Sequence, residues 1–239
     1  MKNIFPENSF AKVKIKTRYR PPFLIYFKTC STKNWNYKKR LLVIFTSLLM
    51  MQILISPTLA KAQNIQLNYK VAKGDDDIGW LSLSKNIAGN RLSLILNSEI
   101  KFRLLFLFTV SAKETSVFEN GVLMSSSQFR KTNGDTKIDT QTKLLGSQYQ
   151  VLENGEKKIL PFATIGINLL SLYFQEPLNN ESVYCDNHQC YSPIIKTSDG
   201  GYKVKFPDGN SNSYYYRDGI CIKIKIDHTF YSAVVTLIP

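Results

Sequence analysis

The stretch "RLSLILNSEIKFRLLFLFTV", residues 91–110, carries the clearest strand pattern of the chain. Every even-numbered side chain in it is apolar except Ser98: Leu92, Leu94, Leu96, Ile100, Phe102, Leu104, Phe106, Phe108 and Val110. The odd-numbered positions begin polar and become mixed at Leu105 and Leu107. Because successive side chains of a strand point to opposite faces, the pattern predicts β-structure with one face buried throughout.

The length of this pattern indicates curvature. At about 3.3 Å per residue, twenty residues of straight strand would span ~65 Å, too much for a domain of this size. We therefore expect the strand to bend or break around Asn97–Lys101, within a strongly curved sheet that has an apolar inner face. A similar alternation returns in residues 220–226, where isoleucines at even positions would place Cys221 on the opposite face, beside Lys223 and Lys225.

Turn signals separate the alternating segments. Asn-Gly and Asp-Gly pairs supply the positive φ angles of tight hairpin turns, and they or single glycines recur at Gly74, Asn120-Gly121, Asn133-Gly134, Asn154-Gly155, Gly200-Gly201, Asp208-Gly209 and Asp218-Gly219. The chain from residue 63 is thus predicted to be mainly β, a strongly curved antiparallel meander or open half-barrel.

One segment departs from the strand pattern. Residues 165–174 place Ile165, Leu169, Leu172 and Tyr173 on one helical face, with Thr164 as the expected cap and Pro177 as the stop. We expect one short helix over about 165–174, packed at the concave face or the mouth of the curved sheet.

Most of the positive charge of the chain lies in its first 62 residues. The chain has a formal net charge of +13, but residues 1–62 contain twelve Lys and Arg and one acidic residue, so only +2 remains for residues 63–239. The end of this region is typical of a secretory signal peptide. It has a basic flank at Lys38-Lys39-Arg40, an apolar run at 41–60 and a small-x-small cleavage site before Gln63. An uncleaved inner-membrane anchor at 41–60 is the alternative.

These features predict a basic extension at 1–37, upstream of the true translation start, a signal peptide at 38–62 and a single β domain at 63–239. The protein would then be exported to the periplasm or cell envelope. The balanced charge of residues 63–239 does not indicate a nucleic-acid partner.

Three stretches support a family resemblance: "KFRLLFLFTVSAKETSVFENGVLMSSS" (101–127), "LYFQEP" (172–177) and "KVKFPDGNSNSYYYRDG" (203–219). Together they resemble an uncharacterised domain-of-unknown-function family of exported Gram-negative bacterial proteins, which shares Leu-Tyr-Phe-x-Glu-Pro and Pro-Asp-Gly-x-x-Asn-x-Tyr-x-Tyr motifs. The resemblance covers most of 65–238. It implies a periplasmic antiparallel β protein, loosely similar to lipoprotein-carrier-like half-barrels, and no catalytic residues.

Other candidate sites have simpler interpretations. Asp75-Asp76-Asp77 lacks the ligand spacing of a calcium loop and is typical of a hairpin tip. Glu176 suits a capping or ion-pair role, and Tyr214-Tyr215-Tyr216 is ordinary strand composition. His188 and His228 stand in no catalytic motif, so we predict neither an enzyme nor a cofactor.

Two cysteines flank a four-residue turn in "VYCDNHQCYS", residues 183–192. We expect Cys185 and Cys190 to face each other across a hairpin and to form a disulfide in an oxidising compartment. A metal site with His188 and free or otherwise paired thiols are the alternatives; we predict no metal.

The apolar stripe suggests a function. A hydrophobic or lipid-like molecule would lie in the trough of the sheet against Phe102, Leu104, Phe106 and Phe108, with Leu169 and Tyr173 of the helix as its lid. The alternatives are an envelope structural or interaction module with a fully packed core and, third, a hydrolase.

Overall fold

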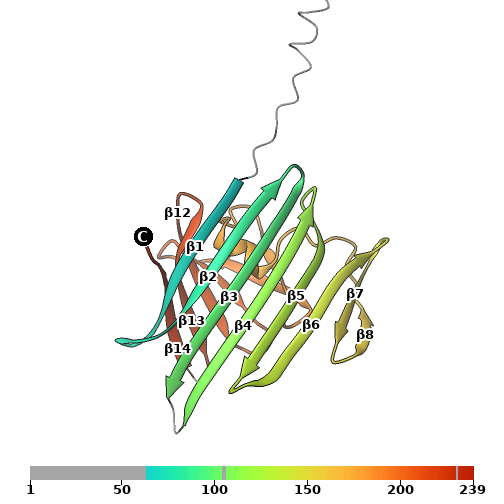
Figure 1. The fold of residues 1–239 in the computed structure, drawn as a ribbon. Helices are drawn as coiled ribbons and strands as arrows, with labels where there is room; N and C mark the ends of the chain where they lie inside the picture. Colours follow the sequence, from blue (N-terminus) through green and yellow to red (C-terminus); the bar gives the residue numbers. More distant parts are fainter. Residues whose placement is uncertain (1–62, 104–105, 230) are drawn as a thin grey trace, which may run out of the picture. The chain divides into compact units, whose positions relative to one another are not determined.

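The computed structural model describes residues 63–103, 106–229 and 231–239. The expected extension at 1–37, the signal peptide at 38–62 and Leu104 lie outside the described residues. Figure 1 shows the β domain that the described residues form. Its strands are β1 (Gln63–Lys73), β2 (Asp76–Ala88), β3 (Arg91–Arg103), β4 (Leu107–Glu119), β5 (Val122–Thr132), β6 (Asp135–Leu145), β7 (Gln148–Glu153), β8 (Glu156–Ile159), β9 (Ser182–Cys185), β10 (Cys190–Lys196), β11 (Tyr202–Lys205), β12 (Ser211–Arg217), β13 (Ile220–His228) and β14 (Tyr231–Leu237).

These strands form one antiparallel sheet made of two meanders. The strand order is β8-β7-β6-β5-β4-β3-β2-β1-β14-β13-β12-β11-β10-β9, so the first and last strands pair and β8 and β9 are the two edges. The sheet curls into an open half-barrel, which confirms the predicted fold class. Among the described strands, consecutive strands are neighbours in the sheet except β8 and β9, where the chain leaves one edge and returns at the other.

The hairpin turns use the predicted residues. Asn120 and Gly121 have φ angles of 50° and 77° in the turn between β4 and β5, and Asn154 and Gly155 repeat this between β7 and β8. Such angles match the twist of the strands that a two-residue turn connects. The exposed Asp75 lies at the tip between β1 and β2, where a hairpin tip was expected.

The long apolar stripe is a hairpin. β3 ends at Arg103 and β4 begins at Leu107, so the expected break at Asn97–Lys101 was wrong. Phe102 pairs with Phe108 and Ile100 with Val110. Even-numbered residues therefore face even-numbered partners, and the apolar face of β3 continues on β4 without a change of parity.

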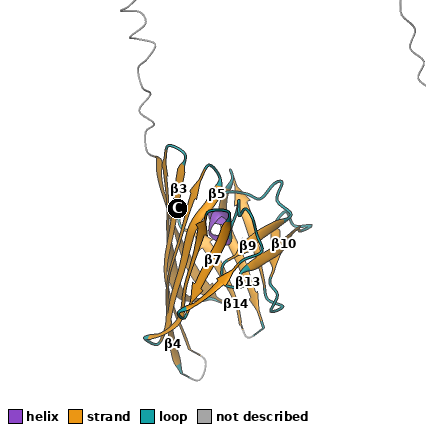
Figure 2. Ribbon diagram, turned by 90° about the vertical axis from the view of Figure 1, so that its right-hand side faces the viewer, coloured by secondary structure: helices purple, strands orange, loops and turns teal. Residues whose placement is uncertain are grey.

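A segment of the chain crosses the interior from β8 to β9. Residues 160–181 contain the one helix of the described chain, the 3-10 helix η1 (Leu169–Tyr173). Figure 2 shows it enclosed between the walls of the half-barrel. Before η1 the backbone is extended: Leu123 N donates to Ile165 O (2.8 Å) and Tyr184 N donates to Ile167 O (3.1 Å).

The helix was predicted too long. It begins at Leu169 because Asn168 is its cap: the Asn168 side chain accepts from the Ser171 N–H at 3.2 Å. Thr164 is not the cap, since the residues that follow it bond to β5 and β9 instead of continuing a helix.

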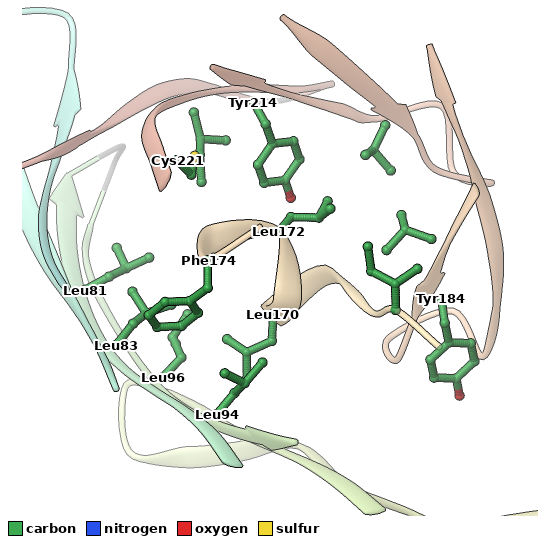
Figure 3. Packing of buried hydrophobic residues seen from close by; sticks show 14 of the residues in the cluster. Leu81, Leu83, Leu94, Leu96, Leu170, Leu172, Phe174, Tyr184, Tyr214 and Cys221 are labelled. Carbon is green, nitrogen blue, oxygen red and sulfur yellow. The ribbon is translucent and has the colours of Figure 1, made fainter. Parts of the chain in front are cut away.

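Side chains of the crossing segment complete the core. Leu170, Leu172 and Phe174 are buried, and Figure 3 shows Leu170 directed towards Leu94 and Leu172 towards Tyr214. The half-barrel is thus stabilised by apolar contacts between its walls and this segment, not by a second sheet. No helix in the described ranges is long and apolar enough to cross a membrane.

A bulge overturns the expected exposure of Cys221. Tyr215 pairs with Lys223 but Tyr216 pairs with Cys221, so one extra residue of β13 lies between these pairs. Because of this extra residue, the side chains that precede the bulge in β13 point to the opposite face of the sheet from the one that simple alternation predicts. Cys221 is therefore fully buried, and Tyr69 Oη donates to its carbonyl at 2.7 Å.

Candidate ligand-binding cavity

A cavity of about 640 Å³ lies inside the half-barrel, next to η1. Leu169, Leu170 and Tyr173 line it from the helix. Its walls come from both meanders, with apolar side chains that include Val71, Ile78, Leu81, Leu96, Ile100, Phe102, Val110, Ala112, Ile226 and Val235. The crossing segment occupies only part of the space between the curved walls.

Only some of the residues that were expected to bind a ligand line the cavity. Phe102, Leu169 and Tyr173 line the cavity. Phe108 is not among the lining residues but stacks on Phe102, with ring centroids 5.5 Å apart. Phe106 is 74% exposed beside the turn between β3 and β4, because the strand expected to carry it inward ends before it.

One wall of the cavity is polar. Glu114 of β4 and Gln128 of β5 are paired in register, and Arg130 follows on the same face. Arg130 Nη2 lies 3.9 Å from Glu114 Oε1. Burial raises the pKa of Glu114, while the Arg130 charge and hydrogen bonding by Gln128 act in the opposite direction.

Two residues of the cavity wall have a buried side-chain oxygen without a hydrogen-bond partner among the described residues. Gln128 Oε1 and Asn212 Oδ1 accept no hydrogen bond from the described part of the chain. Gln128 comes from β5 and Asn212 from β12, on different meanders, and both line the cavity. The sequence did not predict these residues, because strand parity alone does not show which inward polar residues remain unpaired.

Both histidines lie in the cavity wall. His188 Nε2 is 3.7 Å from Asp208 Oδ2, and the imidazole stacks on Phe206 at 5.8 Å. His228 lies beside Tyr231 at 4.9 Å, and burial lowers the pKa of His228. Three separate turns bring these groups together, so their spacing in the sequence carried no signal.

Cys185, His188 and Asp208 have the residue types of a nucleophile, a base and its orienting acid. Burial, however, raises the pKa of Cys185 to about 12, so the thiol stays protonated at neutral pH. Across the described ranges, no hydrogen bond joins the His188 imidazole to the Cys185 thiol, whereas His188 N donates to the Cys185 carbonyl at 3.2 Å. This arrangement therefore does not activate the thiol. No metal-binding group of three or more His, Cys, Asp or Glu side chains occurs in the described ranges.

The cysteine pair lies on the predicted hairpin. β9 and β10 place Cys185 directly opposite Cys190. Residues directly opposite in antiparallel strands have Cα atoms about 4.5–5.5 Å apart, within the span of a disulfide. The described cysteines, 185, 190 and 221, are free thiols in this structure.

A buried polar network anchors η1 to both meanders. The Asn168 amide donates to Ser116 Oγ (2.7 Å) and to Asp186 Oδ2 (3.1 Å), and Ser126 Oγ donates to Asp186 Oδ1. Burial raises the pKa of Asp186 to about 6, although the bonds from Ser126 and Asn168 favour its charged form. The network joins β4, β5 and the β9–β10 turn to the start of the helix.

The two stretches "LYFQEP" and "KVKFPDGNSNSYYYRDG" contact each other in the fold. Tyr216 Oη donates to the Leu172 carbonyl at 2.9 Å. Glu176 accepts from the hydroxyl of Tyr202, the residue just before the second stretch, at 2.8 Å. The motif residues thus hold η1 against the second meander, which is a structural role.

A family model decides where the chain belongs. The model for "Domain of unknown function (DUF6134)" matches residues 69–238. The chain belongs to this family. The DUF6134 region runs from within β1 to just beyond β14, and it confirms membership of an uncharacterised family.

Other known proteins add little to the DUF6134 assignment. The crystal structure of a beta-barrel-like protein of domain of unknown function DUF1849 from Brucella abortus is similar at 9% sequence identity and a TM-score of 0.46. The similarity covers 74% of this chain and 96% of that chain. No curated protein matches this chain in sequence.

Proposed function

We propose that this DUF6134 protein is an exported, non-catalytic binding protein that holds a hydrophobic or amphipathic molecule, such as a lipid, in its half-barrel. The observation that carries the proposal is the cavity of about 640 Å³ beside η1. Small-molecule sites are typically about 300–1,000 Å³, mostly apolar, with a few placed polar groups. This cavity has that size and that mixture.

The same observation weighs against the structural alternative. A module that only stabilises the envelope or presents an outer surface gains from a fully packed interior, because unfilled space costs packing contacts. Here the inner residues of β3 and β4 remain next to open volume although η1 packs beside them. A binding function gives that volume a use.

A cavity-filling variant tests the proposal. Ala112 lines the cavity, so Ala112→Phe should exclude a bound molecule. We expect protein purified from its native envelope to yield about one lipid-like molecule per chain by organic extraction and mass spectrometry, and Ala112→Phe to yield about tenfold less.

Lys113→Phe is the matched control, because it introduces the same side chain at an exposed position next to Ala112. This control should retain the molecule. Absence of any bound molecule from the unaltered protein, or equal amounts in Ala112→Phe, would refute the binding function.

We further propose that export exposes the β9–β10 hairpin to oxidation, so that Cys185 and Cys190 become linked. Peptide mapping of the non-reduced envelope protein should show this link and an N-terminal peptide that begins at Gln63. The bond closes a short loop and should add ~2 kcal/mol of stability at most. A link from Cys221 to either cysteine would contradict the pairing, since Cys221 is buried and should react with alkylating reagents only after unfolding.

A further inference from the structure

One arginine lies among apolar residues in the wall of the cavity. Arg130 of β5 lines the cavity, and 36% of its side-chain surface is accessible. Its register partners on the adjacent strands, Ala112 of β4 and Ile138 of β6, line the cavity as well. The Arg130 side chain is therefore within reach of a bound molecule, and an apolar side chain borders it on each side.

The protein compensates the charge of Arg130 only weakly. Among the described residues, the guanidinium pairs only with the carboxylate of Glu114, and Nη2 lies 3.9 Å from Oε1. This separation is longer than a hydrogen bond, and an arginine has five N–H donors. Burial also raises the pKa of Glu114 and so disfavours the charged form of this partner. Arg130 thus retains capacity for a second anionic partner.

The other titratable groups of the lining do not take this place. Asp208 Oδ2 lies 3.7 Å from His188 Nε2, and Lys73 Nζ lies over the Phe102 ring, 5.9 Å from its centroid. Burial lowers the pKa of His228, and the Arg130 charge acts in the same direction, so His228 is neutral at neutral pH. Arg130 is therefore the cation that can bind an anionic group against the apolar wall.

The surroundings of Arg130 favour an oxyanion with a single charge. A guanidinium binds carboxylates and phosphates through two parallel hydrogen bonds, and apolar walls strengthen the attraction because they lower the local dielectric constant. A phosphate monoester carries nearly two negative charges at neutral pH, so Glu114 would repel it more strongly than it repels a carboxylate. The chain of a bound carboxylate would contact Ala112, Ile138 and the apolar side chains beyond them.

We propose that the cavity binds amphipathic molecules with a carboxylate head, such as fatty acids, and that Arg130 pairs with this head. This inference rests on the proposed binding function and adds both the chemical class of the head group and the residue that selects it. A neutral or cationic head gains no ion pair with Arg130.

Probes of equal chain length test the inference. We would measure displacement of an uncharged fluorescent apolar dye from the purified protein by decanoate, 1-decanol, decylamine and decyl phosphate. The measurement is made at about pH 8, where decanoate is ionised. We expect decanoate to bind about tenfold more tightly than 1-decanol, because only the carboxylate forms charge-assisted hydrogen bonds with the guanidinium. Decanoate should also bind more tightly than the amine and the phosphate.

Variants of both members of the ion pair distinguish a ligand anchor from a structural ion pair. Arg130→Gln should lower the affinity for decanoate about tenfold and leave that for 1-decanol unchanged. Glu114→Gln should raise the affinity for decanoate about threefold, because it removes the competing anion. The two substitutions combined leave no unpaired charge in the wall. The combined variant should show the same loss as Arg130→Gln and serves as the test if that variant does not fold.

Arg91→Gln is the matched control. Arg91 also pairs with a glutamate of β4, since its Nη1 lies 3.5 Å from Glu119 Oε1, but it is exposed and does not line the cavity. This variant should bind all probes as the unaltered protein does.

The outcomes separate the head-group inference from the binding function. Equal affinity for decanoate and 1-decanol, or a decanoate preference that persists without Arg130, would overturn the inference and leave apolar binding intact. No gain in Glu114→Gln would overturn it as well, because Arg130 would then serve only to neutralise Glu114. Tightest binding of decylamine or decyl phosphate would overturn it by identifying a different head. Failure of every probe to displace the dye, or of the dye to bind, would refute the binding function itself.

Discussion

Replacing Leu172 with alanine is expected to lower the free energy of unfolding by about 3 kcal/mol. Leu172 is fully buried in η1, and its side chain is directed to Tyr214 in the facing wall (Figure 3). The substitution deletes apolar contacts at the centre of the half-barrel and leaves unfilled space that rigid strands cannot close. Urea unfolding followed by circular dichroism measures the change.

Leu178→Ala is the control, since Leu178 follows shortly after η1 but is 69% exposed. Its effect should stay within about 0.5 kcal/mol. A loss of less than about 1 kcal/mol for Leu172→Ala would show that the crossing segment does not carry the core.

The second large effect concerns pH. Burial raises the pKa of Asp186 from 3.8 to about 6. Between these pH values the folded protein holds a proton that the unfolded chain has lost, so this group stabilises the fold as the pH falls from about 7 to about 4. The difference between the two pKa values corresponds to about 3 kcal/mol.

Asp186→Asn should remove this dependence, because an amide can bond to both Ser126 and Asn168 without carrying charge. As the pH rises from 4 to 7, the unaltered protein should lose up to about 3 kcal/mol of stability through this group, whereas the variant should not. The difference in free energy of unfolding between variant and unaltered protein should therefore shift by that amount in favour of the variant, as measured by urea unfolding across the range. Parallel curves for the two proteins would contradict the prediction.

Asp199→Asn provides a control of opposite sign. Hydrogen bonds from Thr197 and Tyr215 lower the pKa of Asp199 to about 2. Asp199 therefore contributes stability above pH 3.8 that is lost as the pH falls towards 2. Its replacement should destabilise the protein near neutral pH, and the difference should shrink on acidification.

The hairpins show which features of the fold the local sequence predicts. Asn120-Gly121 and Asn154-Gly155 adopt the positive φ angles that their composition favours. The even-numbered stripe of residues 91–110 lies on one face as its alternation indicates, because facing positions in the β3–β4 hairpin have the same parity. Where the strand ends was not predictable, since apolar residues continue through the position of the turn.

Other errors arose where a distant partner decides local conformation. The 3-10 helix starts at Leu169 because the residues before it hydrogen-bond to Leu123 and Tyr184, far away in the chain. Cys221 is buried because the pairing of β12 with β13 contains a bulge. Neither the hydrogen bonds nor the bulge leaves a pattern within its own segment.

The sequence by itself determined an antiparallel β domain, its turns, the apolar inner face and the opposed cysteines, because strand alternation and turn geometry are properties of neighbouring residues. The tertiary structure alone decided that β1 pairs with β14, that residues 160–181 cross the interior, and that Gln128 and Asn212, from different meanders, line one cavity. These features depend on which strands meet after the sheet curves. That choice is made by burial summed over the whole domain.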